Sequence, residues 1–392
     1  MKRFYLPAIR IRGFGPFRDV LFRFNRLELI IGANGVGKSR LFRFLRFLRD
    51  ACTGPIPYQV LAGPSRRHPF RQSGPEMFFW NAQIDFDGLP LFYQGELARE
   101  PEQVHLLFER IFTKKSIDEQ NPGGFTFLDF RDGRGLVRDP ADGPFIRKEW
   151  NLNAPDRLGL SAMTDANLPV LFALRAYIRR WRFYNPTAFA LERMRGPAVP
   201  AGETGLLSED GANLNAVLYH LHRDHPEAFA DLKSLIQFAV PGFRDLDVRP
   251  LGDGTEVLAF WREEGVDGEL TLADLSDGIL RFMALASLCV VPEPPPLICI
   301  DDPGLGLHPR TLPVLTGLFE KAAERTQVLL TTHDSYFLTQ FDPENLAVIK
   351  KTADGSVYAN ARHSQTLMDR LRQVEAENLE QLFRADELET LF

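Results

Sequence analysis

A glycine-rich stretch near the N-terminus constrains the fold more than any other feature of the sequence. Residues 26–50 read RLELIIGANGVGKSRLFRFLRFLRD, and within them Gly32, Gly37, Lys38 and Ser39 fit the spacing G-x-x-x-x-G-K-[ST]. An apolar strand is predicted immediately before the glycines, and a helix rich in Leu and Phe after them. Strand, loop and helix in this order favour a phosphate-binding loop over a glycine turn with an incidental lysine.

The chemistry of such a loop follows from its residue types. Glycines allow backbone N–H groups to close around phosphate oxygens, and the start of the following helix adds positive potential. Lys38 is expected to reach the outer phosphates, and Ser39 is expected to ligate Mg²⁺. The other candidate contacts in and beside the loop are Asn34, Gly35 and Arg40. The sequence therefore predicts a nucleoside triphosphate site that uses magnesium.

A pair of adjacent carboxylates ends a second apolar stretch, LICIDDPGLGLHP at residues 297–309. Asp301 and Asp302 follow apolar residues and precede a proline and glycines, which indicates a buried strand that ends in a turn. Taken alone, paired acids at a strand end are more often a surface turn than a site. If this strand lies beside the strand that enters the glycine loop, Asp301 reaches Mg²⁺ and Asp302 faces the water that attacks the γ-phosphate.

Two further segments supply candidate residues. QVLLTTHD, residues 327–334, predicts another apolar strand, and the histidine that follows it, His333, suits either a γ-phosphate sensor or an ordinary turn. In TLADLSDGILRFMALASL, residues 271–288, Ser276 and Gly278 stand at the start of an apolar helix. Serine is a good N-cap in any helix, so this segment on its own also fits a purely structural role.

In their order along the chain, GANGVGKS, LSDGILRF, LICIDDPGLGLHP and TTHD resemble the motifs of the ABC-type ATPases. The likeness is strongest to the RecF/SMC-like branch and, within it, to bacterial predicted AAA-type ATPases related to the heads of the OLD family. It covers most of the chain, because IRIRGFGPFRDVLFRF also resembles the N-terminal strands of that branch. The resemblance implies an α/β P-loop NTPase fold, with a mostly parallel sheet core, an antiparallel β elaboration and a helical lobe that carries the signature motif.

The same resemblance implies roles for individual residues. ATP and Mg²⁺ would be held by the loop residues named above, Asp301 would support the metal, and His333 would be the switch histidine. Ser276 and Gly278 would contact the γ-phosphate of ATP held by a second protomer. Two chains would then enclose two nucleotides, and the homodimer would depend on ATP because neither half-site is complete alone.

The chain departs from the family at the acid pair. Relatives usually read D-E-P-E where this chain has Asp301, Asp302, Pro303 and Gly304, so an aspartate replaces the catalytic glutamate. The missing methylene withdraws the carboxylate by about 1.5 Å, and a misplacement of about 1 Å can lower a rate on the order of 10²-fold. Hydrolysis is therefore expected to be slow or absent unless the backbone shifts to compensate.

Two other family positions are not matched clearly. Relatives often carry F-R-S-F where residues 15–17 are Gly-Pro-Phe, which leaves Arg12 or Arg18 as substitutes for the missing arginine. The Q-loop glutamine has Gln94 as its candidate. The sequence therefore does not assign the contacts to the nucleobase.

The 392 residues are expected to form a single ABC-type head. Its predicted parts are N-terminal strands and P-loop at 1–50, a β-rich elaboration at 51–154, a helical lobe at 155–275, and the signature helix, acid pair, switch histidine and C-terminal helix at 276–392. A net charge of −6 argues against broad binding to phosphate backbones but is compatible with a local basic patch.

Composition also bears on the compartment. The longest apolar run is much shorter than a membrane span, and the N-terminus has no apolar core of the kind found in secretory signals. The three cysteines have no metal-like spacing. These features predict a cytoplasmic protein, with no membrane partner and with buried, reduced thiols.

The best cluster of cations around an aromatic residue surrounds Trp181 and comprises Arg175, Arg179, Arg180 and Arg182. Such a cluster can grip single strands or phosphates. It is also what core packing produces when arginine head groups extend to the surface, and core packing is the favoured interpretation here.

Two functions are open at this point. The first is a Mg²⁺-dependent ATPase head whose dimer cycle serves DNA repair or defence against foreign DNA, with a nuclease or effector partner, or DNA itself, as candidate ligands. The second is a switch in which ATP closes the dimer with negligible hydrolysis, and Asp302 is the residue that separates the two. A transporter motor would need a coupling surface for a membrane subunit, and the sequence shows no such surface.

Overall fold

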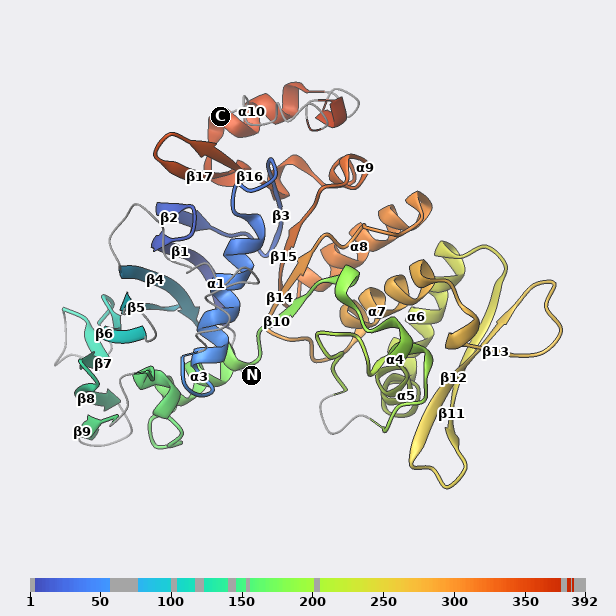
Figure 1. Ribbon diagram of the computed structural model, residues 1–392, viewed down its shortest axis with the longest axis horizontal. Coiled ribbons are helices and arrows are strands. Elements are labelled where there is room, and N and C mark those ends of the chain that lie inside the picture. The colour runs from blue at the N-terminus through green and yellow to red at the C-terminus, as the bar shows by residue number, and fades with distance from the viewer. Residues whose placement is uncertain are drawn as a thin grey trace.

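The computed structural model describes residues 4–56, 77–99, 104–116, 123–139, 146–152, 156–200, 205–374, 379–381 and 383. The chain forms a six-stranded, mostly parallel sheet flanked on one side by an eight-stranded antiparallel sheet and on the other by a helical lobe (Figure 1). A three-stranded antiparallel sheet lies at the outer side of that lobe. The predicted fold class, an α/β P-loop head with an antiparallel elaboration, is confirmed.

The six-stranded sheet carries the motifs. Its strand order is β10 (Arg182–Tyr184), β14 (Leu297–Asp301), β15 (Gln327–Thr331), β3 (Leu27–Ile31), β16 (Leu346–Thr352) and β17 (Gly355–Asn360). All neighbours are parallel except β16 and β17. The expectation that β14 lies directly beside β3 is therefore wrong, because β15 pairs with both and separates them.

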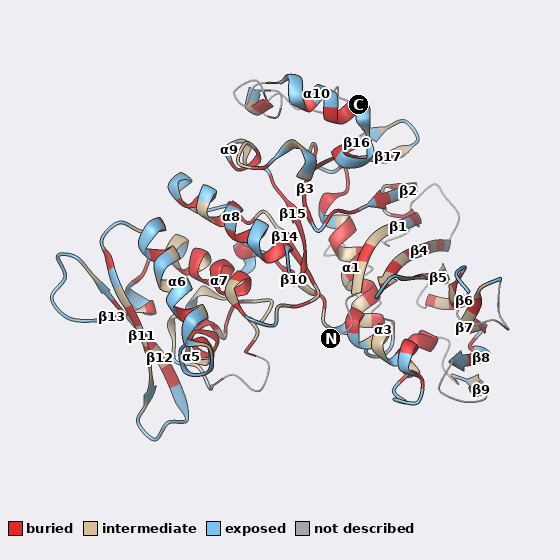
Figure 2. Cartoon of the chain, turned by 180° about the vertical axis from the view of Figure 1, so that it is seen from behind, coloured by how far each residue is buried: buried red, intermediate tan, exposed pale blue. Residues whose placement is uncertain are grey.

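Alternation along these strands divides the apolar residues between two cores. In β3, Ile30 packs into the core shared with the antiparallel sheet, whereas Leu29 and Ile31 pack into the core shared with the helical lobe. In β14, Cys299 likewise packs into the core shared with the antiparallel sheet, and Ile300 packs into the core shared with the helical lobe. Both faces of the sheet are covered, which is why the central strands read as continuous apolar runs (Figure 2).

The antiparallel sheet is built from eight strands, whose bounds are β2 (Phe17–Arg23), β1 (Phe4–Phe14), β4 (Met77–Phe86), β5 (Leu89–Arg99), β6 (Val104–Thr113), β7 (Phe125–Arg131), β8 (Arg134–Asp139) and β9 (Ile146–Asn151) in spatial order. Helix α1 (Lys38–Ala51) packs its apolar face against this sheet. The Phe47 ring lies 5.5 Å from that of Phe78 and 6.0 Å from that of Trp80. Short η1 (Gly159–Ala162) and α3 (Pro169–Arg179) complete this core.

The helical lobe contains α4 (Leu191–Arg195), α5 (Leu214–Asp224), α6 (Pro226–Ala239), α7 (Asp277–Val290) and α8 (Leu312–Ala323). The segment predicted to be helical, residues 155–275, also contains the three-stranded sheet of β11 (Phe243–Leu251), β12 (Glu256–Glu263) and β13 (Leu270–Thr271). The alternation within FRDLDVRPL and EVLAFWRE is the signal for these strands, because alternate side chains are buried, namely Leu246 and Val248 in β11 and Val257, Ala259 and Trp261 in β12, where the strands pack on α5 and α6.

Shorter elements connect these parts, namely η2 (Pro186–Ala188), η3 (Leu272–Asp274), η4 (Pro309–Thr311), α9 (Ser335–Leu338), η5 (Pro343–Asn345), η6 (Ala361–His363) and α10 (Gln365–Gln373). The sequence TLMDRLRQVEAENLEQLF, residues 366–383, is where the C-terminal helix is predicted; α10 covers its first part and ends at Gln373, and residues 375–378 and 382 lie outside the described part. The predicted core thiols are confirmed, since Cys52, Cys289 and Cys299 are all free and buried. None of the described helices has the length and apolar character to cross a membrane.

A buried carboxyl group ties β3 to β17 two strands away. Glu28 is fully buried and accepts hydrogen bonds from the backbone N–H of Asn25 at 2.9 Å, from the Tyr358 hydroxyl and from the Asn360 side-chain amide. Burial raises the pKa of Glu28 to about 8, although these hydrogen bonds oppose the shift. The group is therefore mostly protonated at neutral pH, and β3 is anchored to β17 without a buried charge.

This raised pKa makes folding stability depend on pH. Because an unfolded glutamate has a pKa of 4.5, the folded chain holds an extra proton between about 4.5 and 8, and the free energy of unfolding should fall as pH rises through that window. Glu28→Gln should remove a slope of up to about 1.4 kcal/mol per pH unit. Urea unfolding of both chains across this range checks the prediction. Equal slopes in the two chains would contradict it.

Candidate functional site

The loop between β3 and α1 needs glycine at two positions for reasons internal to the fold. Gly32 has φ 146°, and a Cβ there would overlap the carbonyl oxygen of Ile349. Gly37 has φ 122°, and a Cβ there would lie 2.7 Å from the Phe17 ring. Gly35, with φ 79°, is exposed and has open space where a Cβ would be. The loop is thus fixed against the sheet on one side and open on the other.

Lys38 lies inside this loop. Its Nζ donates hydrogen bonds to the carbonyl oxygens of Gly32 at 2.6 Å and Ala33 at 3.0 Å, and the residue is 4% exposed. Ser39 follows it in the first turn of α1 and is exposed. That turn contains no acidic residue and the N-cap is a glycine without a side-chain bond, so no side chain of the turn itself offsets the positive helix terminus. The arrangement suits an anion with several oxygens.

The two carboxylates at the end of β14 differ in conformation and in partners. Asp301 lies opposite Thr331 in the ladder and accepts a hydrogen bond from the Thr331 hydroxyl. Asp302 has φ 56°, in the left-handed region, and its Oδ1 accepts a hydrogen bond from the backbone N–H of His333 at 2.7 Å. Burial raises the pKa of Asp302, and the nearby Asp301 charge adds to the effect, while the His333 amide opposes it.

Parallel pairing brings these groups to one edge of the sheet. Asp301 lies opposite Thr331, and Thr331 lies opposite Ile30, two residues before the glycine loop starts. His333 follows β15 at the same edge and is exposed. The phosphate loop, the acid pair and the switch histidine predicted from sequence therefore lie at the carboxyl ends of neighbouring strands, as the chemistry requires.

Sequence reasoning missed the residues that hold the acid pair. Thr332 is fully buried, its side chain is hydrogen bonded to Asp302, and its Oγ1 accepts the Asp334 amide at 2.9 Å. Asp334 in turn caps α9 by accepting from the amides of Tyr336 and Phe337. The two threonines of TTHD were the available signal, since consecutive hydroxyls before a histidine at a strand end can each bind one neighbouring carboxylate.

The predicted signature residues lie at the start of α7. Ser276 is the N-cap, and its hydroxyl accepts from the Ile279 amide at 3.4 Å, so the structural role considered for it is confirmed. Ser276 is also exposed. A Cβ on Gly278 would come within 2.9 Å of the carbonyl oxygen of Gly306, which places the loop after β14 in contact with this helix start.

A second set of contacts holds the same helix start from α4. Arg195 forms an ion pair of 2.6 Å with Asp277, and Arg281 lies 3.8 Å from the same carboxylate. Hydrogen bonding to Arg195 lowers the pKa of Asp277. The guanidinium of Arg281 also donates to the carbonyl oxygen of Pro186, just after β10. The start of α7 is thus linked to the acid loop and to the β10 edge of the sheet.

The remaining sequence candidates lie elsewhere. Gln94 sits in the middle of β5, paired with residues of β4 and β6, and so belongs to the antiparallel sheet and not to the motif edge. Arg18 is paired with Asp354 at 2.7 Å, and Arg12 lies over the ring of Phe79. Arg40, beside Ser39, is half-buried, and its side chain lies next to Gly15, where a Cβ would be 3.8 Å from the Arg40 Cδ.

The cluster around Trp181 is a core feature. The Trp181 ring is fully buried, 5.6 Å from the ring of Tyr177. Its carbonyl oxygen accepts a hydrogen bond from Arg49, and Arg182 donates to the same oxygen. The preferred interpretation of this cluster as core packing is confirmed.

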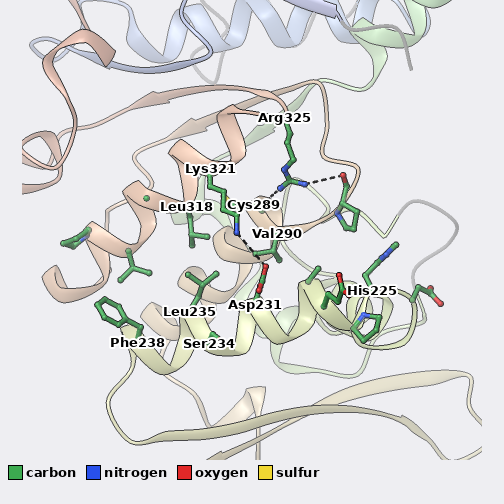
Figure 3. A pocket seen from close by; sticks show the side chains of 18 residues that line it. His225, Asp231, Ser234, Leu235, Phe238, Cys289, Val290, Leu318, Lys321 and Arg325 are labelled. Atoms are coloured by element: carbon green, nitrogen blue, oxygen red, sulfur yellow. Dashed lines mark hydrogen bonds and ion pairs between the residues drawn. The ribbon is translucent and has the colours of Figure 1, made fainter.

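A large hollow lies away from this edge, between α6 and α8 (Figure 3). It has a volume of about 1000 Å³ and is lined by apolar side chains such as Leu235, Phe238 and Leu318. Lys321 and Asp231 approach each other across it at 3.8 Å. None of the P-loop, acid-pair or switch residues lines it, so it is not the nucleotide site.

Three solved structures are similar to this chain over most of their length. The head of an Smc protein, solved bound to the C-winged helix domain of ScpA, aligns with a TM-score of 0.50 at 11% identity over 91% of this chain and 97% of that chain. An Smc head with an extended coiled coil, bound to a ScpA domain from Pyrococcus furiosus, gives 0.49 at 11% over 94% and 100%. The SMC head domain from Thermotoga maritima gives 0.41 at 14% over 91% and 98%.

Comparison of sequences identifies the family. No curated protein matches the chain significantly. The model of the family described as "AAA domain, putative AbiEii toxin, Type IV TA system" matches residues 29–339, from within β3 to just past α9. This span includes the phosphate loop, the signature helix, the acid pair and the switch histidine. The chain therefore belongs to this AAA domain family of P-loop ATPases, and it has the fold of an SMC-type head.

Proposed function

We propose that the protein is an ATP-hydrolysing head that closes into a homodimer around ATP and couples its nucleotide state to a nucleic-acid process such as DNA repair or defence. The observation that carries the proposal is the meeting of the Lys38 loop, Asp301 and Asp302 at one edge of a parallel sheet. Membership of the AAA domain family implies ATP binding, which supports the nucleotide-binding part of the proposal.

The residues at this edge fit a triphosphate with magnesium. Glycines 32 and 37 shape a loop that is open toward solvent at Gly35, and Lys38 already lies within it. Ser39 and Asp301 supply the hard oxygen donors that Mg²⁺ prefers. When bound, the ion would neutralise charge on the outer phosphates. Thr331 would keep the Asp301 carboxylate turned toward that position.

Asp302 is proposed as the base that orients and deprotonates the attacking water. Its raised pKa brings the carboxylate closer to the operating pH, where a general base is most effective. Its left-handed backbone is a conformation that aspartate adopts more readily than most residues. His333 holds one carboxylate oxygen through its backbone amide, and the residue is exposed at the same edge of the sheet, where its side chain would sense the γ-phosphate.

A switch without appreciable hydrolysis is the second candidate. The Asp302 carboxylate is bound by both the His333 amide and the Thr332 side chain, so less of it is free to accept a proton from water. In this case ATP would still close the dimer, and the occupied state would be the signal.

The dimer is proposed from the position of α7. Ser276 is exposed at the start of α7, and its hydroxyl is hydrogen bonded to the Ile279 amide and not to the P-loop of the same chain. It is therefore available to ATP on a second protomer. The Smc head of similar fold was solved with a domain of ScpA. By analogy we propose a protein partner, such as a nuclease or effector, in the cytoplasm.

The chemistry is tested at Asp302. Asp302→Asn should lower steady-state ATP hydrolysis by about 10²-fold or more, because it removes the base. Asp302→Glu, which restores the longer side chain of relatives, should hydrolyse ATP at least as fast as the native chain. Lys38→Ala, which should not bind nucleotide, sets the background rate. A native rate no higher than that of the Asn variant would contradict the enzyme and favour the switch.

The dimer is tested at Ser276. Ser276→Arg should block ATP-induced dimerisation, because a long cation would occupy the exposed helix start, while ATP binding by the monomer should persist. Light scattering with a slowly hydrolysed ATP analogue measures the change. Ser364→Arg is the matched control, since Ser364 caps α10 through the same 3.4 Å contact and its loss carries the same cost of about 1 kcal/mol. Dimers that form equally in both variants would refute the proposed interface.

A further inference from the structure

A second charged surface lies on the antiparallel sheet. Strands β6, β7 and β8 line a hollow of about 450 Å³ that carries the arginines Arg110, Arg131, Arg134 and Arg138, and among its described lining residues Asp129 is the one carboxylate. All of these arginines are exposed. Such a concentration of positive charge on a chain whose net charge is −6 requires an explanation of its own.

Most of this charge is not neutralised by neighbouring residues. Arg110 approaches Asp129 at 3.7 Å. Within the part of the chain that the structure describes, no carboxylate pairs with Arg131, Arg134 or Arg138. Arg131 and Arg134 lie directly opposite each other in the ladder, where like charges destabilise a sheet. The facing pair of Arg131 and Arg134 is unfavourable for the sheet alone, which points to an anionic ligand.

Phenylalanine rings continue the same face beside the hollow. Phe108 lies opposite Arg131 in the register, and the side chains of Phe92, Phe108 and Phe112 are partly exposed. Phe92 stacks on Phe112 with ring centroids 5.3 Å apart. The guanidinium of Arg110 lies over the Phe112 ring at 5.0 Å. Cations and rings therefore lie together on this surface, and Glu96, opposite Phe108 in the register, adds one carboxylate to it.

The pattern extends across the sheet to its first strands. Phe79 and Phe108 have ring centroids 6.2 Å apart, and the guanidinium of Arg12 lies 5.0 Å from the Phe79 ring. Lys114 lies 5.2 Å from the Phe92 ring. The opposite face of these strands is buried in the core. Core packing therefore does not require the rings on the exposed face.

We propose that this face binds single-stranded nucleic acid, with phosphates in the arginine-lined hollow and bases stacked on the phenylalanine rings. Arginine binds phosphate bidentately, and aromatic rings stack unpaired bases with little regard to sequence. A duplex fits less well, because its bases are already stacked on each other. The inference deepens the proposed function and rests on it for the link to ATP, but the site is separate from the phosphate loop.

Fluorescence anisotropy tests the site with a labelled oligothymidylate, and in parallel an oligouridylate, of about 20 nucleotides. The full chain is used at low salt without ATP. The variant Arg131→Gln/Arg134→Gln should bind roughly tenfold more weakly, and the slope of log K against log[salt] should fall by about 0.7 for each lost phosphate contact.

The matched control is Arg193→Gln/Arg244→Gln. It removes the same charge from side chains that are 72% and 60% exposed in the other lobe, so binding should not change. Phe108→Ala tests stacking and should weaken binding several-fold without altering the salt slope. Retained ATP binding shows that each variant is folded.

Three results would overturn the proposal. These are a native chain that binds ATP but no single strand, equal weakening by the control pair, and a duplex that binds as tightly as the single strand. Lys38→Ala separates this site from the proposed function, since it should lose ATP and keep the oligonucleotide. A native chain that binds the oligonucleotide but not ATP would contradict the proposed function alone.

Discussion

Parallel pairing of β15 with β3 on one side and with β14 on the other is the constraint on which the site depends. It brings the end of β3, where the phosphate loop starts, and the end of β14, where the acids lie, to one edge. The register is specified strongly because alternate residues of these strands belong to two different cores. A slip by one residue would exchange both faces and move Asp301 away from the edge, so the packing of the cores also sets the site.

The residues at the end of β15 also hold both carboxylates of the acid pair in place. Thr331 binds Asp301, while Thr332 and the His333 amide bind Asp302. This explains how an aspartate with a left-handed backbone is kept in one orientation. It also creates a conflict, because the bonds that orient the carboxylate compete with the water it would activate. Gly278 contacts the loop that follows Asp302, so a movement of that loop would shift the start of α7.

Much of the site could be predicted because its signals are local. The glycine spacing, the lysine that follows it and the serine at the start of α7 are each encoded within a few residues. The insertion of β15 between β3 and β14 could not be predicted, because strand order is not encoded locally. The basic face was missed for the same reason, since Arg110, Arg131 and Arg138 meet only through pairing of strands. The cluster that is local in sequence, around Trp181, proved to be core.

The central claim is that a triphosphate binds between Lys38 and the acid pair. A crystal structure or cryo-EM map with Mg²⁺ and a non-hydrolysable ATP analogue tests it most directly. The account predicts a triphosphate in the loop of residues 32–37, with the Lys38 amine turned from the carbonyls of Gly32 and Ala33 toward the phosphates and Asp301 beside the metal. Nucleotide bound elsewhere, with the Lys38 amine still on those carbonyls, would contradict it.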